Sequence, residues 1–323
     1  MPVIVIGNIY VGGTGKTPLA VAIGQLLQSH GWRPALVSRG VGRLASRSAA
    51  TGQGCDLDWQ LFGDEPALIA RKSGMPVGVH ESRRIAVEQV LSHYPNTDII
   101  ICDDGLQHYG LARDFEILVQ DERGIGNGLL LPAGPLREPP SRLAEVDLVL
   151  RRSSQTPAVQ ACTNGELAFR LEIDGFWQPA TGEELTVEQF VFLCQSQRPV
   201  VAMAGIGVPQ RFFDSLENLG INLDQKYPLA DHAPIRARWL SKLPKGTILV
   251  TEKDAIKLAA PVADPRIWVA KTTVRWWRND SDEFIMQKLA SAGIKRTEQK
   301  DGPQTAGYSG LPNLQGSTAD ERK

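Results

Sequence analysis

The sequence lacks several features that would place it in a specialised class of protein. No apolar run is long enough to cross a membrane, and Met1-Pro2 stands directly before a predicted strand, so we expect no signal peptide. Cys55, Cys102, Cys162 and Cys194 do not have the spacing of metal ligands, so we expect reduced thiols in a cytoplasmic protein. The formal net charge of −1 gives no sign of a nucleic-acid partner. Internal repeats are also absent.

The glycine-rich stretch at residues 3–18 organises the first part of the chain. An apolar run predicts a strand, which is followed by a glycine-rich turn and the start of a helix. Glycines in the turn let backbone N–H groups converge on a phosphate, Lys16 reaches the β- and γ-phosphates, and the Thr17 hydroxyl binds Mg²⁺. The predicted nucleotide-binding residues are Val11, Gly12, Gly13, Thr14, Gly15, Lys16, Thr17 and Pro18.

Tyr10 departs from the strict phosphate-loop pattern, which has glycine at this position. The form present resembles the variant loops of the dimerising ATPases, which carry a signature lysine where Val11 stands. A phosphate loop predicts a bound nucleoside triphosphate but does not separate a kinase from a motor, a switch or a partitioning ATPase.

The alternation of strands and helices up to about residue 150 predicts an α/β fold with a doubly wound, mostly parallel sheet like that of P-loop NTPases. Residues 151–198 predict a connector with a β-hairpin that turns at Asp174-Gly175. Residues 199–294 predict a second, smaller α/β domain that closes a cleft. We expect the polar tail at residues 295–323 to be disordered. The 323 residues are enough for two domains and a sizeable core.

Asp103 and Asp104 end a continuous apolar strand that begins near Asp98. A buried parallel strand delivers such carboxylates to its C-terminal edge, where one of them can hold Mg²⁺ directly or through water. The alternative is a polar strand terminus without a function. The phosphate loop in the same sheet favours the metal site.

Five further residues are open to two interpretations each. Asp64 opens a helix and would serve as an N-cap, and His232 could be an ordinary surface or core histidine. Arg137 lies in a Gly/Pro-rich loop and could form only a local salt bridge. Arg83-Arg84 at a helix start is electrostatically misplaced unless an anion is nearby, which weakly favours a phosphate-facing role for one of the two.

An ordered set of motifs resembles the tetraacyldisaccharide 4′-kinase family, the lipid A kinases. The match runs from residue 2 to about residue 290, and the ordered set is far more specific than any single motif. The motifs are GN (7–8), VGGTGKTP (11–18), SRG (38–40), GDEP (63–66), DDGLQH (103–108), GPLRE (134–138), AGIG (204–207), DH (231–232) and TEKDA (251–255). The family's phosphate loop has the same form as the loop here, including the residue at Tyr10.

The resemblance implies transfer of the γ-phosphate of ATP to the 4′-hydroxyl of a tetraacylated glucosamine disaccharide 1-phosphate, which forms lipid IVA. It implies that Asp64 is the catalytic base and that His232 pairs with it across the interdomain cleft. Lys16 and Mg²⁺ then neutralise the transferring phosphoryl group, and Arg84 or Arg137 does the same or holds the substrate phosphate. ATP and Mg²⁺ are the implied cofactors.

Members of the family usually begin with a hydrophobic helix that docks on the inner membrane, whereas this sequence starts at the first strand. We therefore expect a peripheral enzyme at the cytoplasmic face of the inner membrane, with a lipid substrate and a weakened membrane attachment. Two other classes stay open at this point. One is a dimerising P-loop ATPase switch of the partitioning or metallochaperone kind, and the other is a non-catalytic nucleotide-binding module.

Overall fold

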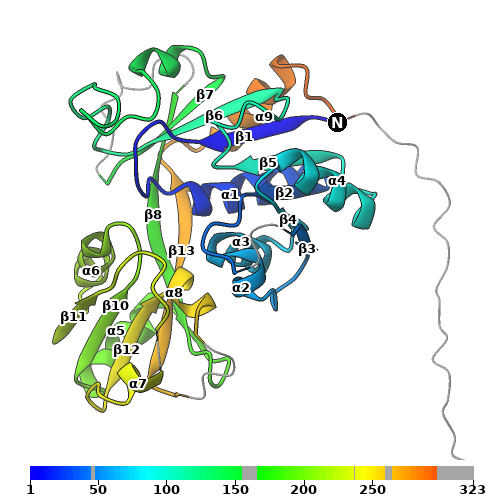
Figure 1. The fold of residues 1–323 in the computed structure, drawn as a ribbon. Helices are drawn as coiled ribbons and strands as arrows, with labels where there is room; N and C mark the ends of the chain where they lie inside the picture. Colours follow the sequence, from blue (N-terminus) through cyan, green and yellow to red (C-terminus); the bar gives the residue numbers. More distant parts are fainter. Residues whose placement is uncertain (45–47, 155–165, 236, 259–263, 297–323) are drawn as a thin grey trace, which may run out of the picture.

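The computed structural model describes residues 1–44, 48–154, 166–235, 237–258 and 264–296, and its strands form one 13-stranded sheet. The order is β11-β10-β12-β13-β8-β7-β6-β1-β5-β2-β4-β3, with β9 paired to β8. Figure 1 shows two lobes joined by the long strands β8 and β13. The predicted α/β class with a mostly parallel sheet is confirmed. The predictions for Cys162 and for the tail from residue 297 onward lie outside the described residues.

The first lobe is built around β1 (Val3–Gly7), a strand whose residues are all buried. Its uninterrupted apolar run needs cover on both faces of the sheet, as in other parallel α/β folds. The neighbouring strands pair in parallel except β3, which is antiparallel to β4. They are β2 (Pro34–Ser38), β3 (Ala50–Gly52), β4 (Val77–Val79), β5 (Ile99–Asp103), β6 (Phe115–Gln120) and β7 (Leu148–Arg152).

Helices cover both faces of this lobe. One core joins α1, α3 and α9 to one face of the sheet, and a second core packs α4 and the 3-10 helix on the other face. The C-terminal helix α9 thus returns to the first lobe, where Ile285 and Leu289 are buried. The helices are α1 (Lys16–Ser29), α2 (Trp59–Phe62), α3 (Asp64–Ser73), α4 (Arg83–His93), the 3-10 helix (Pro140–Ala144) and α9 (Ser281–Ser291).

Strands β8 (Glu166–Trp177) and β13 (Ile267–Trp276) pair antiparallel and connect the lobes (Figure 1). The turn predicted at Asp174-Gly175 is wrong, because both residues lie inside β8. The register shift between Lys271 and Thr272 accommodates the extra residue as a bulge, so pairing with β13 overrides the local turn signal. The chain turns instead before β9 (Glu184–Leu185), which pairs with the end of β8.

The second lobe carries three parallel strands that extend the sheet beyond β13. They are β10 (Val200–Ala204), β11 (Gln225–Pro228) and β12 (Thr247–Thr251), and the helices are α5 (Val187–Ser196), α6 (Pro209–Asn218), α7 (Ala237–Leu240) and α8 (Glu252–Ile256). Sequence patterns missed α5, whose start carries a capping box between Thr186 and Gln189. The predicted boundaries between two domains stay a prediction.

The loops that follow the parallel strands of the two lobes meet. A methyl group placed on Gly207, in the loop after β10, would lie 3.3 Å from the backbone nitrogen of Gly13 in the loop after β1. In α6, Arg211 Nη1 lies 3.1 Å from the buried carboxylate of Asp121, just beyond β6. Ligands of open α/β sheets bind beyond the carboxyl ends of the strands, so this junction is the place for a site.

Candidate active site

The buried side chain of Asn8 fixes the conformation of the phosphate loop by hydrogen bonds. Its Nδ2 donates to the carbonyl oxygens of Tyr10 and Gly12 and to Thr14 Oγ1, at 2.6, 3.3 and 3.3 Å. Gly12 and Gly15 have φ angles of 101° and 95°, a region that favours glycine. The first turn of α1 has neither a side-chain cap nor an acidic residue, so its N–H groups stay available to an anion.

Tyr10 has a structural role in this loop. Its ring lies 4.3 Å from the guanidinium carbon of Arg123, and its backbone forms a bridge with Leu136. The same guanidinium donates to the carbonyl oxygens of Val11 and Gly13, each at 3.4 Å. Tyr10 and Arg123 therefore brace the outer side of the loop, where a glycine would offer no ring.

Lys16 points from the start of α1 toward the end of β5. Its Nζ donates to Asn8 Oδ1 at 3.1 Å and lies 3.3 Å from Asp104 Oδ1. Arg137 reaches Asp104 from the other side, with Nη1 at 3.2 Å from Oδ2. Burial raises the pKa of Asp104, but the charges of Lys16 and Arg137 and their hydrogen bonds leave it below its usual range. Asp104 is therefore a carboxylate between two cations.

Asp103 is buried just behind Asp104, and its Oδ1 has no hydrogen-bond partner among the described residues. Burial raises the pKa of this carboxyl, and the charges of Glu65 and Asp104 raise it further. A buried carboxylate oxygen without a donor is costly unless a cation or a proton satisfies it. This oxygen is suited to a cation.

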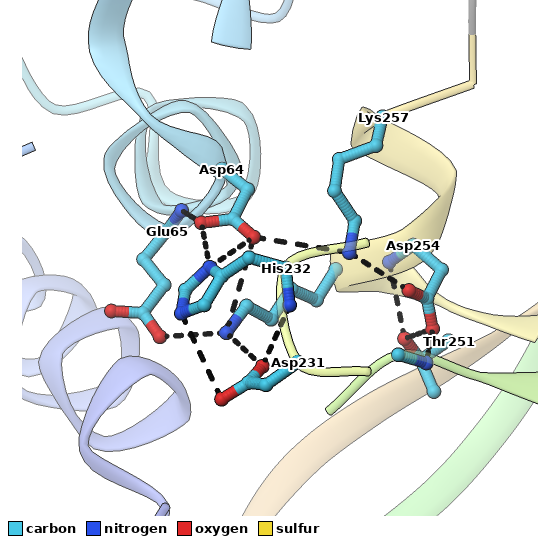
Figure 2. Close-up of polar contacts among 9 residues, drawn as sticks. Asp64, Glu65, Asp231, His232, Thr251, Asp254 and Lys257 are labelled. Carbon is cyan, nitrogen blue, oxygen red and sulfur yellow. Dashed lines mark hydrogen bonds and ion pairs between the residues drawn. The ribbon is translucent and has the colours of Figure 1, made fainter. Parts of the chain in front are cut away.

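Asp64 and His232 meet across the two lobes (Figure 2). Asp64 is the first residue of α3 and is 3% exposed, while His232 lies in the loop after β11. His232 Nδ1 lies 2.9 Å from Asp64 Oδ2 and 3.1 Å from Oδ1, so Nδ1 donates to the ionised carboxylate. The histidine backbone has a φ of 62°, which is uncommon for a residue with a Cβ and marks a constrained site.

This contact shifts the titration of both groups. Burial raises the pKa of Asp64, but the hydrogen bond from His232 and the charges of Lys253 and Lys257 lower it below the usual value. The hydrogen bond to Asp64 raises the pKa of His232 above its usual value, against the effect of burial. The pair is therefore poised as a carboxylate with a readily protonated imidazole.

Lys253 joins the lobes beside this pair. From α8 its Nζ donates to Glu65 Oε1 in α3 at 3.0 Å and to Asp231 Oδ1 at 3.1 Å. The surrounding charges raise the pKa of this lysine despite its burial. A cation shared by carboxylates of both lobes stabilises their contact.

The structure does not bring every predicted residue to this junction. The side chain of Arg84 is 74% exposed on α4, where it pairs with Glu88 at 3.7 Å. Arg83 is buried and donates to the carbonyl oxygens of His80 and Glu81. In the described part of the chain, no hydrogen bond or ion pair joins either arginine to the phosphate loop. Thr17 lies in the first turn of α1.

Sequence reasoning assigned no role to Asn8, Glu65, Lys253 or Lys257, although all four lie in or beside this site. The first three belong to motifs that signalled the family, so the motifs marked their positions but not their contacts. Lys257 follows the TEKDA motif by two residues, and only the packing of α8 on α3 reveals its place.

The strand, phosphate loop and helix, together with carboxylates at the end of the neighbouring strand, define a nucleotide-binding protein of the P-loop fold class. A family model described as tetraacyldisaccharide-1-P 4′-kinase, LpxK, matches residues 1–290. The chain belongs to this family. The match does not favour the alternative of a dimerising ATPase switch.

Known relatives agree with this assignment. Tetraacyldisaccharide 4′-kinase of Bordetella parapertussis is 45% identical over 292 residues, which cover 90% of this chain and 83% of the relative. The enzyme of Dechloromonas aromatica is 42% identical over 276 residues, which cover 83% and 78%. The crystal structure of LpxK from Aquifex aeolicus in complex with ATP aligns with a TM-score of 0.70 and 27% identity, over 90% of this chain and 88% of that chain.

Proposed function

We propose that this kinase transfers the γ-phosphate of ATP to the 4′-hydroxyl of tetraacyldisaccharide 1-phosphate, forming lipid IVA. The observation that carries the proposal is the contact of Asp64 with His232, which are 168 residues apart in the chain. The contact supports a proton acceptor near the junction where the loop after β10 approaches the phosphate loop. The names of the relatives support the substrate.

The phosphate loop, residues 11–18, binds the triphosphate. The N–H groups of the loop and of the first turn of α1 contact phosphate oxygens. The ammonium of Lys16 leaves Asp104 for the β- and γ-phosphates, and Arg137 stabilises the charge on the transferring group. The neighbouring structure with ATP supports this part.

Thr17, Asp103 and Asp104 would hold Mg²⁺. The residues fit such an ion, since magnesium with a nucleotide takes one or two carboxylates and a hydroxyl together with phosphate oxygens. The unpartnered buried oxygen of Asp103 supports the assignment. When bound, the ion would supply positive charge that stabilises the phosphoryl group during transfer.

Asp64 accepts the proton of the 4′-hydroxyl, and His232 orients the carboxylate and stabilises its charge. A sugar hydroxyl is a weak nucleophile until its proton has an acceptor. Asp64 is nearly inaccessible behind the imidazole, so the hydroxyl replaces one of the histidine contacts when it binds. The closed contact of the lobes then excludes water from the reacting phosphate.

Arg84 takes the phosphate that the acceptor already carries. Its side chain is free in solvent apart from a 3.7 Å contact with Glu88, and α4 begins after β4, on the sheet edge that holds the site.

Because the acceptor is a lipid, we propose that the enzyme works as a peripheral protein at the cytoplasmic face of the inner membrane. The described residues contain no helix long and apolar enough to span a bilayer.

The experiment combines the purified chain, ATP and Mg²⁺ with or without the acylated disaccharide 1-phosphate, and follows ADP and lipid by mass spectrometry. We expect one added phosphate per ADP formed and little ADP without the acceptor. ADP release that ignores the acceptor would identify a switch ATPase instead. Arg84→Ala should raise KM for the disaccharide and leave KM for ATP unchanged.

A further inference from the structure

Two lysines approach the Asp64 carboxylate from the second lobe, one in α8 and one, Lys257, directly after it; Figure 2 labels Lys257. Lys253 and Lys257 are one helical turn apart, and each Nζ lies 3.9 Å from Asp64 Oδ2. The start of α8 is fixed by Thr251, whose Oγ1 accepts the Asp254 N–H at 3.1 Å. The backbone that carries the two lysines is therefore fixed at the start of the helix.

The two lysines differ in their other partners. Lys253 is shared with Glu65 and Asp231, which join the lobes, and it keeps some exposure. Lys257 has a fully buried side chain, and its close partner is the equally buried Asp254, whose Oδ1 lies 3.0 Å away. Apart from Asp254, the acid nearest to the Lys257 ammonium is therefore Asp64, at 3.9 Å.

Asp254 is itself held by the backbone of the second lobe. Its Oδ2 accepts the Gly205 N–H at 3.0 Å and the Thr251 hydroxyl at 2.7 Å. This leaves Oδ1 for Lys257, so a chain of contacts runs from the loop after β10 through Asp254 and Lys257 to Asp64. A buried ion pair is seldom the most stabilising choice for such a position, because desolvation offsets much of the attraction. Its placement beside Asp64 indicates an electrostatic role.

We propose that Lys257 is a positioning residue for Asp64: anchored by Asp254, its ammonium holds the carboxylate ionised and oriented from the opposite lobe. This inference rests on the proposed role of Asp64 as base. It also implies that the base is aligned only while α8 is docked on α3, which links the chemistry to closure of the lobes.

All charged groups that face Asp64 enter the expected pH dependence. They are Glu65 from its own helix, Asp231 and His232 from the loop after β11, and Lys253, Asp254 and Lys257 from α8 and its C-terminal end. Among these, Lys257 has a single acid partner other than Asp64. Removing its charge should therefore make Asp64 harder to ionise.

The test compares the chain with Lys257→Met, a variant of similar length that lacks the charge. We expect kcat to fall about 10- to 100-fold, as for a misaligned catalytic group. In the pH profile of kcat, the acid limb should move to higher pH by about one unit or more, as expected for loss of an opposite charge within about 4–6 Å. KM for ATP should not change, because within the described residues no hydrogen bond or ion pair joins Lys257 to the phosphate loop. Lys226→Met, on the edge strand β11, is the matched control and should leave all three quantities unchanged.

A double variant, Lys257→Met with Asp254→Asn, keeps the test valid where the single variant folds poorly. Removing both buried charges should restore thermal stability, yet the acid limb should stay shifted because Asp64 still lacks its cation. Recovery of kcat and of the acid limb together with stability would overturn the proposal in favour of a structural role. A wild-type kcat and acid limb in Lys257→Met would also overturn it. Asp64→Asn separates the two claims, since an active Asp64→Asn would refute the base assignment itself.

Discussion

Replacing Asp64 with asparagine separates the chemical role of this carboxylate from its structural one. Asparagine has nearly the same shape and still accepts the Glu65 N–H, which Asp64 Oδ1 accepts at 2.9 Å. The start of α3 should therefore persist. The change removes the charge that His232 approaches at 2.9 Å and that Lys253 and Lys257 face at 3.9 Å each.

The loss of turnover should be large while nucleotide binding is preserved. A general base contributes about 10²- to 10⁴-fold to the rate, which is about 3–5 kcal/mol of transition-state stabilisation. Each 3.9 Å lysine contact corresponds to about 4 kcal/mol of Coulomb energy at an effective dielectric constant of about 20. The lower desolvation cost of asparagine offsets much of this, so we expect the free energy of unfolding to fall by about 1–3 kcal/mol.

Three assays check this prediction: single-turnover phosphate transfer at saturating ATP, calorimetric titration with ATP, and urea denaturation. The expected result is a lost chemical step with unchanged affinity for ATP. The N-cap role expected for Asp64 is wrong, because Gly63 is the N-cap of α3 and Asp64 is its first residue, which accepts the Glu65 N–H. Near-normal turnover combined with reduced stability would refute the reasoning, because Asp64 would then only support the first turn of α3.

The stability difference between the chain and Asp64→Asn should also depend on pH. The pKa of Asp64 lies below its unfolded value, so its contribution is present above the unfolded pKa and is lost as pH falls through the folded pKa. The pKa of His232 is raised by Asp64, so that contribution is complete below the unfolded pKa and is lost as pH rises through the folded pKa. The difference should therefore be largest between about pH 4 and pH 6.5 and shrink on both sides.

Three further changes test other parts of the site and its support. Lys16→Ala should abolish transfer, and near-normal turnover would exclude the phosphate-loop assignment. Even a methyl group on Gly207 would lie 3.3 Å from the backbone nitrogen of Gly13, so the valine of Gly207→Val would press against the phosphate loop. We expect kcat/KM for ATP to fall about tenfold with unchanged thermal stability. In the structure Arg142 Nη2 lies 2.6 Å from the Glu116 carboxylate, and Arg142→Met removes this main partner. Urea denaturation should show a free energy of unfolding lower by about 3–5 kcal/mol.

Much of the first lobe could be predicted from its sequence, because local signals and tertiary structure agree there. β1 and β5 are apolar runs that end in glycine or acids, and the phosphate loop carries its own spacing. The turn expected at Asp174-Gly175 failed because pairing along β13 outweighs a local preference. Strand pairing between distant segments is not contained in any local window.

The site could be predicted only in part for the same reason. From the residues alone, the roles of Asp64 and His232 each had two interpretations, and the family resemblance supplied their pairing. Their contact depends on docking of the two lobes, which brings together residues 168 positions apart. The place of Lys257 depends in addition on how α8 packs on α3, which no periodicity encodes.

The central claim is that ATP phosphorylates a sugar hydroxyl at the junction of the lobes. The most direct measurement treats the acylated disaccharide 1-phosphate with ATP, Mg²⁺ and the purified chain, and locates the new phosphate by ³¹P–¹H correlation spectroscopy. We predict a phosphorus coupled to the proton at the 4′ position, with no such signal from Asp64→Asn. A phosphate at another position, or an equal yield from Asp64→Asn, would contradict the account.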